Sequence, residues 1–211
     1  MYNFQYVTKK EAAPEKKNII EMINEVQDIV RDKFTFQYMF VGSCKNNMVT
    51  QDIKSNIGYD FDVDIEVNDD DEEYEAWELR KILINAFNSV ASEYGYGYCQ
   101  ESTRVFTMKS IDYKNSKIHH SCDFAIINTC DDGQQYIHFY KDSNTYAWQM
   151  QGQGFEYLPG KIQWLKDNEL WNDLKDYYLD KKNNNQDPNK HSRSIFAESV
   201  NEMCQKNGYN G

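Results

Sequence analysis

The chain has 211 residues, 40% of them hydrophobic, and carries a formal net charge of −11 from 34 acidic and 23 basic residues. This length and apolar content suit a folded domain of upper size and exclude a disordered chain. Ten of the acidic residues lie within residues 60–75, so the rest of the chain holds 24 acids against 23 bases. Because the charge has one acidic focus, broad electrostatic binding of nucleic acid or membrane is not expected, whereas a bound cation is.

The sequence favours a cytoplasmic protein without a membrane partner. No segment reaches the roughly 20 apolar residues that a membrane span needs. The first residues, MYNFQYVTKKEAAPEKK, lack the apolar core of a signal peptide. The five cysteines are an odd number without a CxxC pair, which is typical of reduced thiols rather than of disulfides or a zinc site.

The first elements follow from apolar periodicity. Apolar residues at helical spacing predict a helix over about 14–33, with Pro14 in its first turn. Residues 34–41, FTFQYMFV, are typical of a buried strand, and Gly42-Ser43 indicates a tight turn at its end.

The acidic focus begins in a predicted strand. Residues 44–58 indicate a short helix or loop, and the strict alternation DFDVDIEV predicts a strand over 60–67 with acids on one face. The following run, Asp69–Glu75, is expected to be an exposed loop and helix start, where acids favour the helix dipole. A helix over about 74–94 should follow, with one apolar face.

The remaining elements complete an α+β fold with a helical appendix. We expect a small mixed or antiparallel sheet flanked by helices in a core over 1–140, and a mainly helical extension over 141–211 packed on that core. The later elements are expected to be a hairpin of strands over 105–113 and 117–128, a strand over 136–140, a helix over 159–182, a linker over 181–190 and a helix over 192–205.

Three acidic residues are candidates for one metal site. Asp60 and Asp62 are two positions apart on a strand, so their side chains point the same way about 6.5–7 Å apart. Carboxylates at this spacing can converge on one hard cation or on two cations about 3.5–4 Å apart. Asp123, inside the apolar run CDFAII, would complete such a site from a neighbouring strand. Two Mg²⁺ ions there could activate an attacking hydroxyl and neutralise the phosphates of a nucleotide.

The Gly42-Ser43 turn fits the same chemistry. A glycine lets the backbone approach phosphates closely, and the Ser43 hydroxyl with nearby amides can donate hydrogen bonds to them.

Together these motifs resemble the polymerase-β-like nucleotidyltransferases. A strand ending in Gly-Ser, an acid–apolar–acid strand and a third acid on a later strand are that family's pattern. The segment GYDFDVDIEV is most similar to the branch of oligoadenylate synthases, cyclic GMP-AMP synthase and their bacterial cyclic-nucleotide relatives. The resemblance covers roughly residues 34–128. It assigns metal and catalytic roles to Asp60, Asp62 and Asp123, and triphosphate contacts to Gly42, Ser43 and Lys45.

The resemblance implies an enzyme that transfers an NMP group from ATP or another NTP to a hydroxyl acceptor, with two Mg²⁺ or Mn²⁺ ions. The acidic charge favours a small nucleotide or a protein over a long nucleic acid as acceptor. An alternative interpretation keeps the fold but makes the chain a weak or inactive nucleotide-binding or partner protein, of a toxin–antitoxin or defence type.

Two pairs of acids on this strand are candidates for the metal-binding pair, and we call each choice of pair a frame. Asp62 and Asp64 also fit the acid–apolar–acid pattern. We prefer Asp60 and Asp62, because Asp60 opens the strand directly after Gly58-Tyr59, where a site is accessible.

Overall fold

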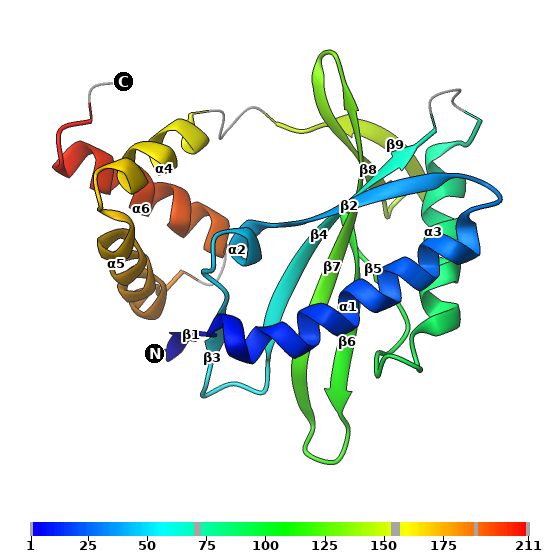
Figure 1. Ribbon diagram of the computed structural model, residues 1–211, viewed down its shortest axis with the longest axis horizontal. Helices are drawn as coiled ribbons and strands as arrows, with labels where there is room; N and C mark the ends of the chain where they lie inside the picture. The colour runs from blue at the N-terminus through cyan, green and yellow to red at the C-terminus, as the bar shows by residue number, and fades with distance from the viewer. Residues whose placement is uncertain (1, 70–72, 153–156, 188–189, 210–211) are drawn as a thin grey trace. The chain divides into compact units, whose positions relative to one another are not determined.

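The computed structural model describes residues 2–69, 73–152, 157–187 and 190–209. The chain divides into two compact units (Figure 1). The larger contains Tyr6–Gln51 and Ser55–Gln151, and the smaller contains Met1–Gln5, Asp52–Lys54 and Gly152–Gly211. The domains expected from the sequence, a core over 1–140 and an extension over 141–211, stay a prediction.

The larger unit is built on a mixed sheet. Its strands follow the order β2-β4-β7-β6-β5, and β8 and β9 extend it as a hairpin from β7. Strand β4 is antiparallel to β2 and parallel to β7, while β6 and β8 are antiparallel to β7. The elements are α1 (Lys9–Val30), β2 (Thr35–Val41), α2 (Gly42–Lys45), β4 (Tyr59–Asn68), α3 (Ala76–Val90), β5 (Gln100–Glu101), β6 (Val105–Asp112), β7 (Lys117–Cys130), β8 (Gly133–Tyr140) and β9 (Thr145–Met150).

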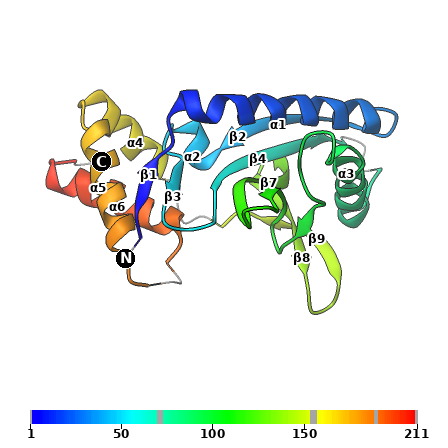
Figure 2. The same cartoon turned by 90° about the horizontal axis from the view of Figure 1, so that it is seen from below.

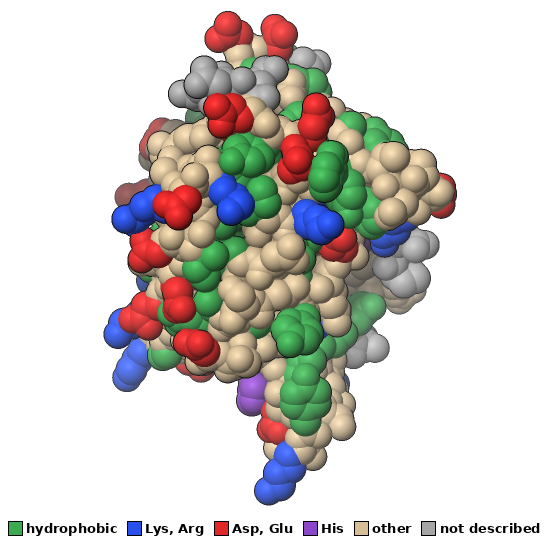
Figure 3. Space-filling model, turned by 90° about the vertical axis from the view of Figure 1, so that its right-hand side faces the viewer, with side chains coloured by type: hydrophobic (Ala, Val, Ile, Leu, Met, Phe, Trp, Pro, Cys, Tyr) green, Lys and Arg blue, Asp and Glu red, His purple; other side chains and the backbone are tan. Residues whose placement is uncertain are grey.

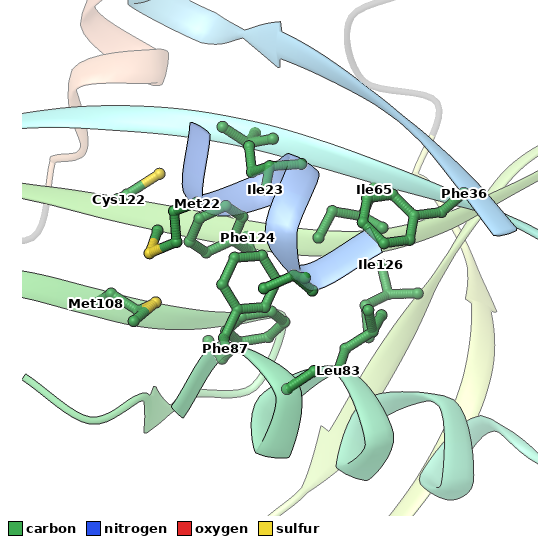
Figure 4. Packing of buried hydrophobic residues seen from close by; sticks show 14 of the residues in the cluster. Met22, Ile23, Phe36, Ile65, Leu83, Phe87, Met108, Cys122, Phe124 and Ile126 are labelled. Atoms are coloured by element: carbon green, nitrogen blue, oxygen red, sulfur yellow. The ribbon is translucent and has the colours of Figure 1, made fainter. Parts of the chain in front are cut away.

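The two faces of this sheet differ. The apolar residues of β4 alternate with acids and are buried together with residues of α1 and α3. Figure 4 shows Met22 of α1 and Phe87 of α3 in the same cluster as Phe124 of β7, and Figure 2 shows α1 running along one side of the sheet. We call the opposite side the carboxylate face; on β4 it bears Asp60, Asp62, Asp64 and Glu66.

The first helix begins earlier than its periodicity indicated. Helix α1 starts at Lys9, because Thr8 and Glu11 form a capping box in which each side chain accepts the other's backbone N–H. Pro14 therefore lies inside the helix, and its predicted place in the first turn is wrong. The capping signal Thr-x-x-Glu was present in the sequence.

Other predicted boundaries also change. The segment 44–58, expected to be helix or loop, contains the last residues of α2 and the short strand β3 (Thr50–Asp52), which pairs with β1 (Phe4–Tyr6). Strand β9 was not predicted, because its sequence TYAWQM offers only a weak alternation.

The single helix predicted over 159–182 is two helices in the smaller unit. Helix α4 (Leu158–Asp167) ends before Glu169, whose φ of +59° is incompatible with a continuing helix, and α5 (Trp171–Asn184) follows. Both pack with α6 (Ser192–Lys206) around a core that includes Leu165, Leu174 and Val200.

The acidic run after β4 partly caps α3. Asp69 accepts hydrogen bonds from the backbone N–H of Glu73 (3.0 Å) and Tyr74 (3.1 Å), and Glu75 forms a capping box with Glu78. Residues 70–72 of this run lie outside the described residues. The described part thus acts as a helix start, as the sequence indicated.

The surface carries both signs of charge. On the face shown in Figure 3, acidic and basic side chains are spread among hydrophobic and polar ones. Within the described ranges, no helix combines the length and apolarity needed to cross a membrane.

A buried arginine joins α3 to the rim of the sheet. Arg80, 1% exposed, forms an ion pair with Glu101 at 2.9 Å. Its guanidinium also donates to four backbone carbonyls, those of Ser102 and Val105 at 2.8 Å, Arg104 at 3.3 Å and Ile137 at 3.4 Å. Such a cation is stable in the interior only because its donors are paired.

A glycine permits the parallel pairing of β4 with β7. Tyr59 pairs with His120, and Gly58 lies just before it, against the backbone of His119. A Cβ on Gly58 would lie 1.9 Å from the carbonyl oxygen of His119. Because the backbone sets the positions of both the added Cβ and the His119 carbonyl oxygen, no side-chain rotation can relieve this contact.

We predict that Gly58→Ala lowers the free energy of unfolding by about 2 kcal/mol or more, because β4 must shift away from β7. Gly160→Ala is the matched control: Gly160 lies in α4, and among the described residues outside its own helix and chain neighbours no atom lies within 4 Å of a Cβ added there, so alanine should be neutral or stabilise by up to about 1 kcal/mol. Urea denaturation followed by circular dichroism compares the two variants. Equal stability of both would show that the close approach at Gly58 is unimportant.

Candidate active site

Parallel pairing of β4 with β7 brings the predicted carboxylates together. In this register Asp62 is the direct partner of Asp123, and Asp60 is the partner of Ser121. Paired residues of neighbouring strands point to the same side of a sheet, about 4.7–4.9 Å apart. Asp60, Asp62 and Asp123 therefore lie side by side on the carboxylate face.

Two hydroxyl groups hold the outer members of this set. The Ser121 hydroxyl donates to Oδ1 of Asp60 across the strand pair. The Thr107 hydroxyl, on the partner position of β6, donates to Oδ1 of Asp123 at 2.5 Å. Sequence reasoning missed both residues, because only the strand register reveals which hydroxyl lies beside which carboxylate.

Burial and mutual repulsion perturb the central carboxylates. Burial raises the pKa of Asp62 to about 6, and the charges of Asp123, Asp60 and Asp64 add to this rise. Burial also raises the pKa of Asp123, while the Thr107 hydrogen bond and the Lys109 charge act in the opposite direction. The site therefore disfavours its own negative charge in the absence of a cation.

Gly42 lies directly against the central carboxylate. Val41, the last residue of β2, pairs with Asp62, and Gly42 then turns the chain into α2 with a φ of +59°. A Cβ on Gly42 would lie 2.6 Å from Oδ2 of Asp62. The position thus requires glycine twice, for its backbone angle and for the space beside the carboxylate.

The other two predicted phosphate contacts share α2 with Gly42. Ser43 is half-buried and Lys45 is exposed, and the carbonyl of Ser43 accepts the Met48 N–H at 2.8 Å. Because β2 runs antiparallel to β4, the chain after Val41 continues toward the Asp60 end of β4.

The alternative frame has a different setting. Asp64 lies between Met39 of β2 and Ala125 of β7, whereas Asp60 lies beside Ser121, whose hydroxyl donates to it.

The donor set suits a magnesium ion. It consists only of carboxylate oxygens, with hydroxyls close by, and hard cations prefer such ligands. In the described part of the chain, no three His, Cys, Asp or Glu side chains enclose a common point as a finished metal site does.

Comparisons of sequence find no relative: no protein-family model matches the chain, and no curated protein is similar to it.

Comparisons of structure do find similar folds. The Vibrio cholerae cyclic AMP-GMP synthase DncV, described as a prokaryotic cGAS homolog, superposes with a TM-score of 0.57 and 15% identity over 89% of this chain and 52% of that one. Its 3'-deoxy ATP-bound form gives 0.54 and 15% over 89% and 51%. Its complex with the linear intermediate 5' pppA(3',5')pG gives 0.53 and 15% over 89% and 53%.

The chain spans about half the length of these solved structures. At this level of identity the similarity concerns the fold. The predicted α+β class is confirmed, and the predicted resemblance holds for the fold alone: the chain has the fold seen in DncV.

Proposed function

We propose that this chain is a Mg²⁺-dependent nucleotidyltransferase that moves an NMP group from an NTP to a hydroxyl acceptor. The observation that carries the proposal is the pairing of Asp62 with Asp123, with Gly42 packed against Asp62. The fold adds support, because DncV has been solved with 3'-deoxy ATP, with GTP and with a linear dinucleotide intermediate.

Each residue has a role in this proposal. Asp60, Asp62 and Asp123 would hold the divalent ions, which lower the pKa of the attacking hydroxyl and neutralise charge on the phosphates. Asp123 is the group that helps remove the acceptor proton, and Thr107 fixes its orientation. Gly42, which has no Cβ to displace the Asp62 carboxylate, would let its backbone approach the phosphates closely.

On α2, the Ser43 hydroxyl donates to the triphosphate and the exposed Lys45 supplies positive charge in this proposal.

The position of α2 supports the Asp60/Asp62 frame over Asp62/Asp64. Gly42 adjoins Asp62, and the chain after it heads toward Asp60, whereas Asp64 lies between Met39 and Ala125. The phosphate-binding turn and the metal pair would then share one end of β4.

The acidic balance of the chain supports a small nucleotide or a protein as acceptor rather than a long nucleic acid. A cytoplasmic location stays a prediction from the sequence.

We predict that Asp60→Asn lowers the rate of pyrophosphate release from NTP by about 100-fold or more, because loss of a metal ligand removes several kcal/mol of charge stabilisation. Asp64→Asn, on the same strand face, should retain most of the activity. Release of pyrophosphate with Mg²⁺ or Mn²⁺ is measured for all four NTPs. The reverse order of the two variants would favour the other frame, and binding of NTP without turnover in the wild type would favour the inactive nucleotide-binding alternative.

The raised pKa of Asp62 leads to a prediction about stability. Without divalent cation at pH 7, Asp62→Asn should raise the free energy of unfolding by roughly 1–3 kcal/mol, because it removes a buried, repelled charge. A raised folded-state pKa means that this penalty is present above about pH 6 and disappears as the pH falls toward 3.8, so the two proteins should converge there. Thermal unfolding in EDTA measures the difference.

Added Mg²⁺ should raise the unfolding temperature of the wild type and have less effect on Asp62→Asn. If Asp62→Asn were less stable than the wild type in EDTA, this result would contradict the proposed repulsion.

We predict that Gly42→Ala abolishes both Mg²⁺ stabilisation and pyrophosphate release, because its Cβ displaces the Asp62 carboxylate. Gly95→Ala is the matched control: Gly95 also has a positive φ, of +76°, but apart from its chain neighbours no atom of the described residues lies within 4 Å of an added Cβ. It should therefore share the backbone strain and keep the activity. Equal losses in the two variants would mean that strain alone explains the effect.

A further inference from the structure

The β8–β9 hairpin has two sides with different aromatic content. On one side Ile137 is fully buried, Phe139 stacks on Tyr146 with ring centroids 4.6 Å apart, and Trp148 packs against the main core. The other side carries what we call the outer aromatic row, which consists of Tyr136, His138 and Tyr140.

The outer aromatic row shares the side of the sheet that bears the carboxylates. Tyr136 pairs with Ile127 of β7, and Ile127 alternates in phase with Asp123. Residues two apart on a strand point to the same side, so the row continues the carboxylate face onto the hairpin.

The rings of the row lie next to one another and next to a cation. Ring centroids of Tyr136 and His138 are 6.1 Å apart, and those of His138 and Tyr140 are 4.2 Å apart. The Arg104 guanidinium lies 4.4 Å from the Tyr136 ring centroid and donates to Gln151 at 2.7 Å. Guanidinium has five donors, and the contact with Gln151 uses one of them.

The rings of the row face polar or short side chains across the hairpin, and the Tyr136 hydroxyl donates to one of them, Gln149, at 3.0 Å. Their partners on β9 are Gln149, Ala147 and Thr145, which are polar or short and form no aromatic pair with them. Tyr140 is 42% exposed. A planar ligand could therefore stack on it without displacing a large neighbour.

The row lies within reach of the carboxylates along β6. The Phe139 N–H donates to the Thr103 carbonyl at 2.7 Å, which places the row beside the chain leading into β6. Thr103 is four residues before Thr107, so the two Cα atoms are at most about 14 Å apart. The Thr107 hydroxyl donates to Asp123. Val105, which lies between Thr103 and Thr107 in the chain, is partly exposed, as is Thr107. This span suits one nucleotide with its phosphate toward the carboxylates.

We propose that the outer aromatic row, with Arg104, binds the nucleobase of a nucleoside phosphate. Aromatic faces stack on bases of any sequence, and a planar guanidinium next to them suits a phosphate or the edge of a base. Purines should bind more tightly than pyrimidines, because they offer a larger stacking surface. The row lies toward Asp123, which is proposed to take the acceptor proton, rather than toward Gly42, which is proposed to contact the triphosphate. We therefore assign the nucleotide that the row binds as the acceptor, and this assignment rests on the proposed function.

The test uses the full chain in EDTA and 2-aminopurine riboside 5'-monophosphate, whose fluorescence falls when its base stacks. Tyr140→Ala should weaken binding by about 5- to 100-fold, and Tyr140→Phe should keep the wild-type affinity. Tyr113→Ala, which removes an 80% exposed tyrosine between β6 and β7, is the matched control and should have no effect. Unchanged affinity in Tyr140→Ala would overturn the proposal.

A second pair of measurements tests Arg104. Arg104→Met should weaken binding of the monophosphate more than binding of the unphosphorylated nucleoside. Equal weakening of both ligands would contradict a phosphate contact by Arg104.

The same probe distinguishes the acceptor from the donor nucleotide. With saturating Mg²⁺ and a non-hydrolysable NTP, quenching should persist if the row holds the acceptor, and displacement of the probe would overturn that assignment. The two proposals also fail separately. Quenching without pyrophosphate release contradicts only the enzyme, whereas pyrophosphate release with full affinity in Tyr140→Ala contradicts only the stacking site.

Discussion

The candidate site depends on one interaction, the parallel pairing of β4 with β7. Antiparallel neighbours can be joined by short turns, but this pair is joined through α3 and β6, as parallel strands require a long connection. The pairing sets Asp62 beside Asp123 and Asp60 beside Ser121. It also demands Gly58, because the two backbones approach too closely there for any side chain.

This pairing places like charges side by side, which lowers the stability of the fold. Three carboxylates on adjacent positions repel one another, and burial raises the pKa of two of them. The apolar side of the same strands is closely packed with Phe61, Phe124 and Ile126 fully buried, which compensates for the repulsion. Sites that a fold maintains against its own stability are frequently functional.

The sequence predicted the strands of the site better than it predicted the boundaries of the helices. The alternation of β4 and the apolar run around Asp123 are strong local signals, and they are confirmed as strands. The register between those strands is a long-range property, so Ser121 and Thr107 could not be recognised as neighbours of the acids. Pro14 was a misleading signal because proline is common in a first turn, whereas the Thr8 capping box decides where α1 begins. The strand that bears the outer aromatic row was predicted over 136–140, but its place on the carboxylate face depends on the pairing of β8 with β7, which is again a long-range property.

Arg80 links several parts of the larger unit near the β8–β9 hairpin. One guanidinium bonds Glu101, the turn before β6 and the Ile137 carbonyl of β8 at once. Breaking any of these contacts leaves a buried cation short of acceptors, so we expect α3, the turn and the middle of β8 to open together. The aromatic rings on either side of Ile137 are thereby carried on a strand that is bonded to a buried cation rather than on a loop that adapts to each ligand.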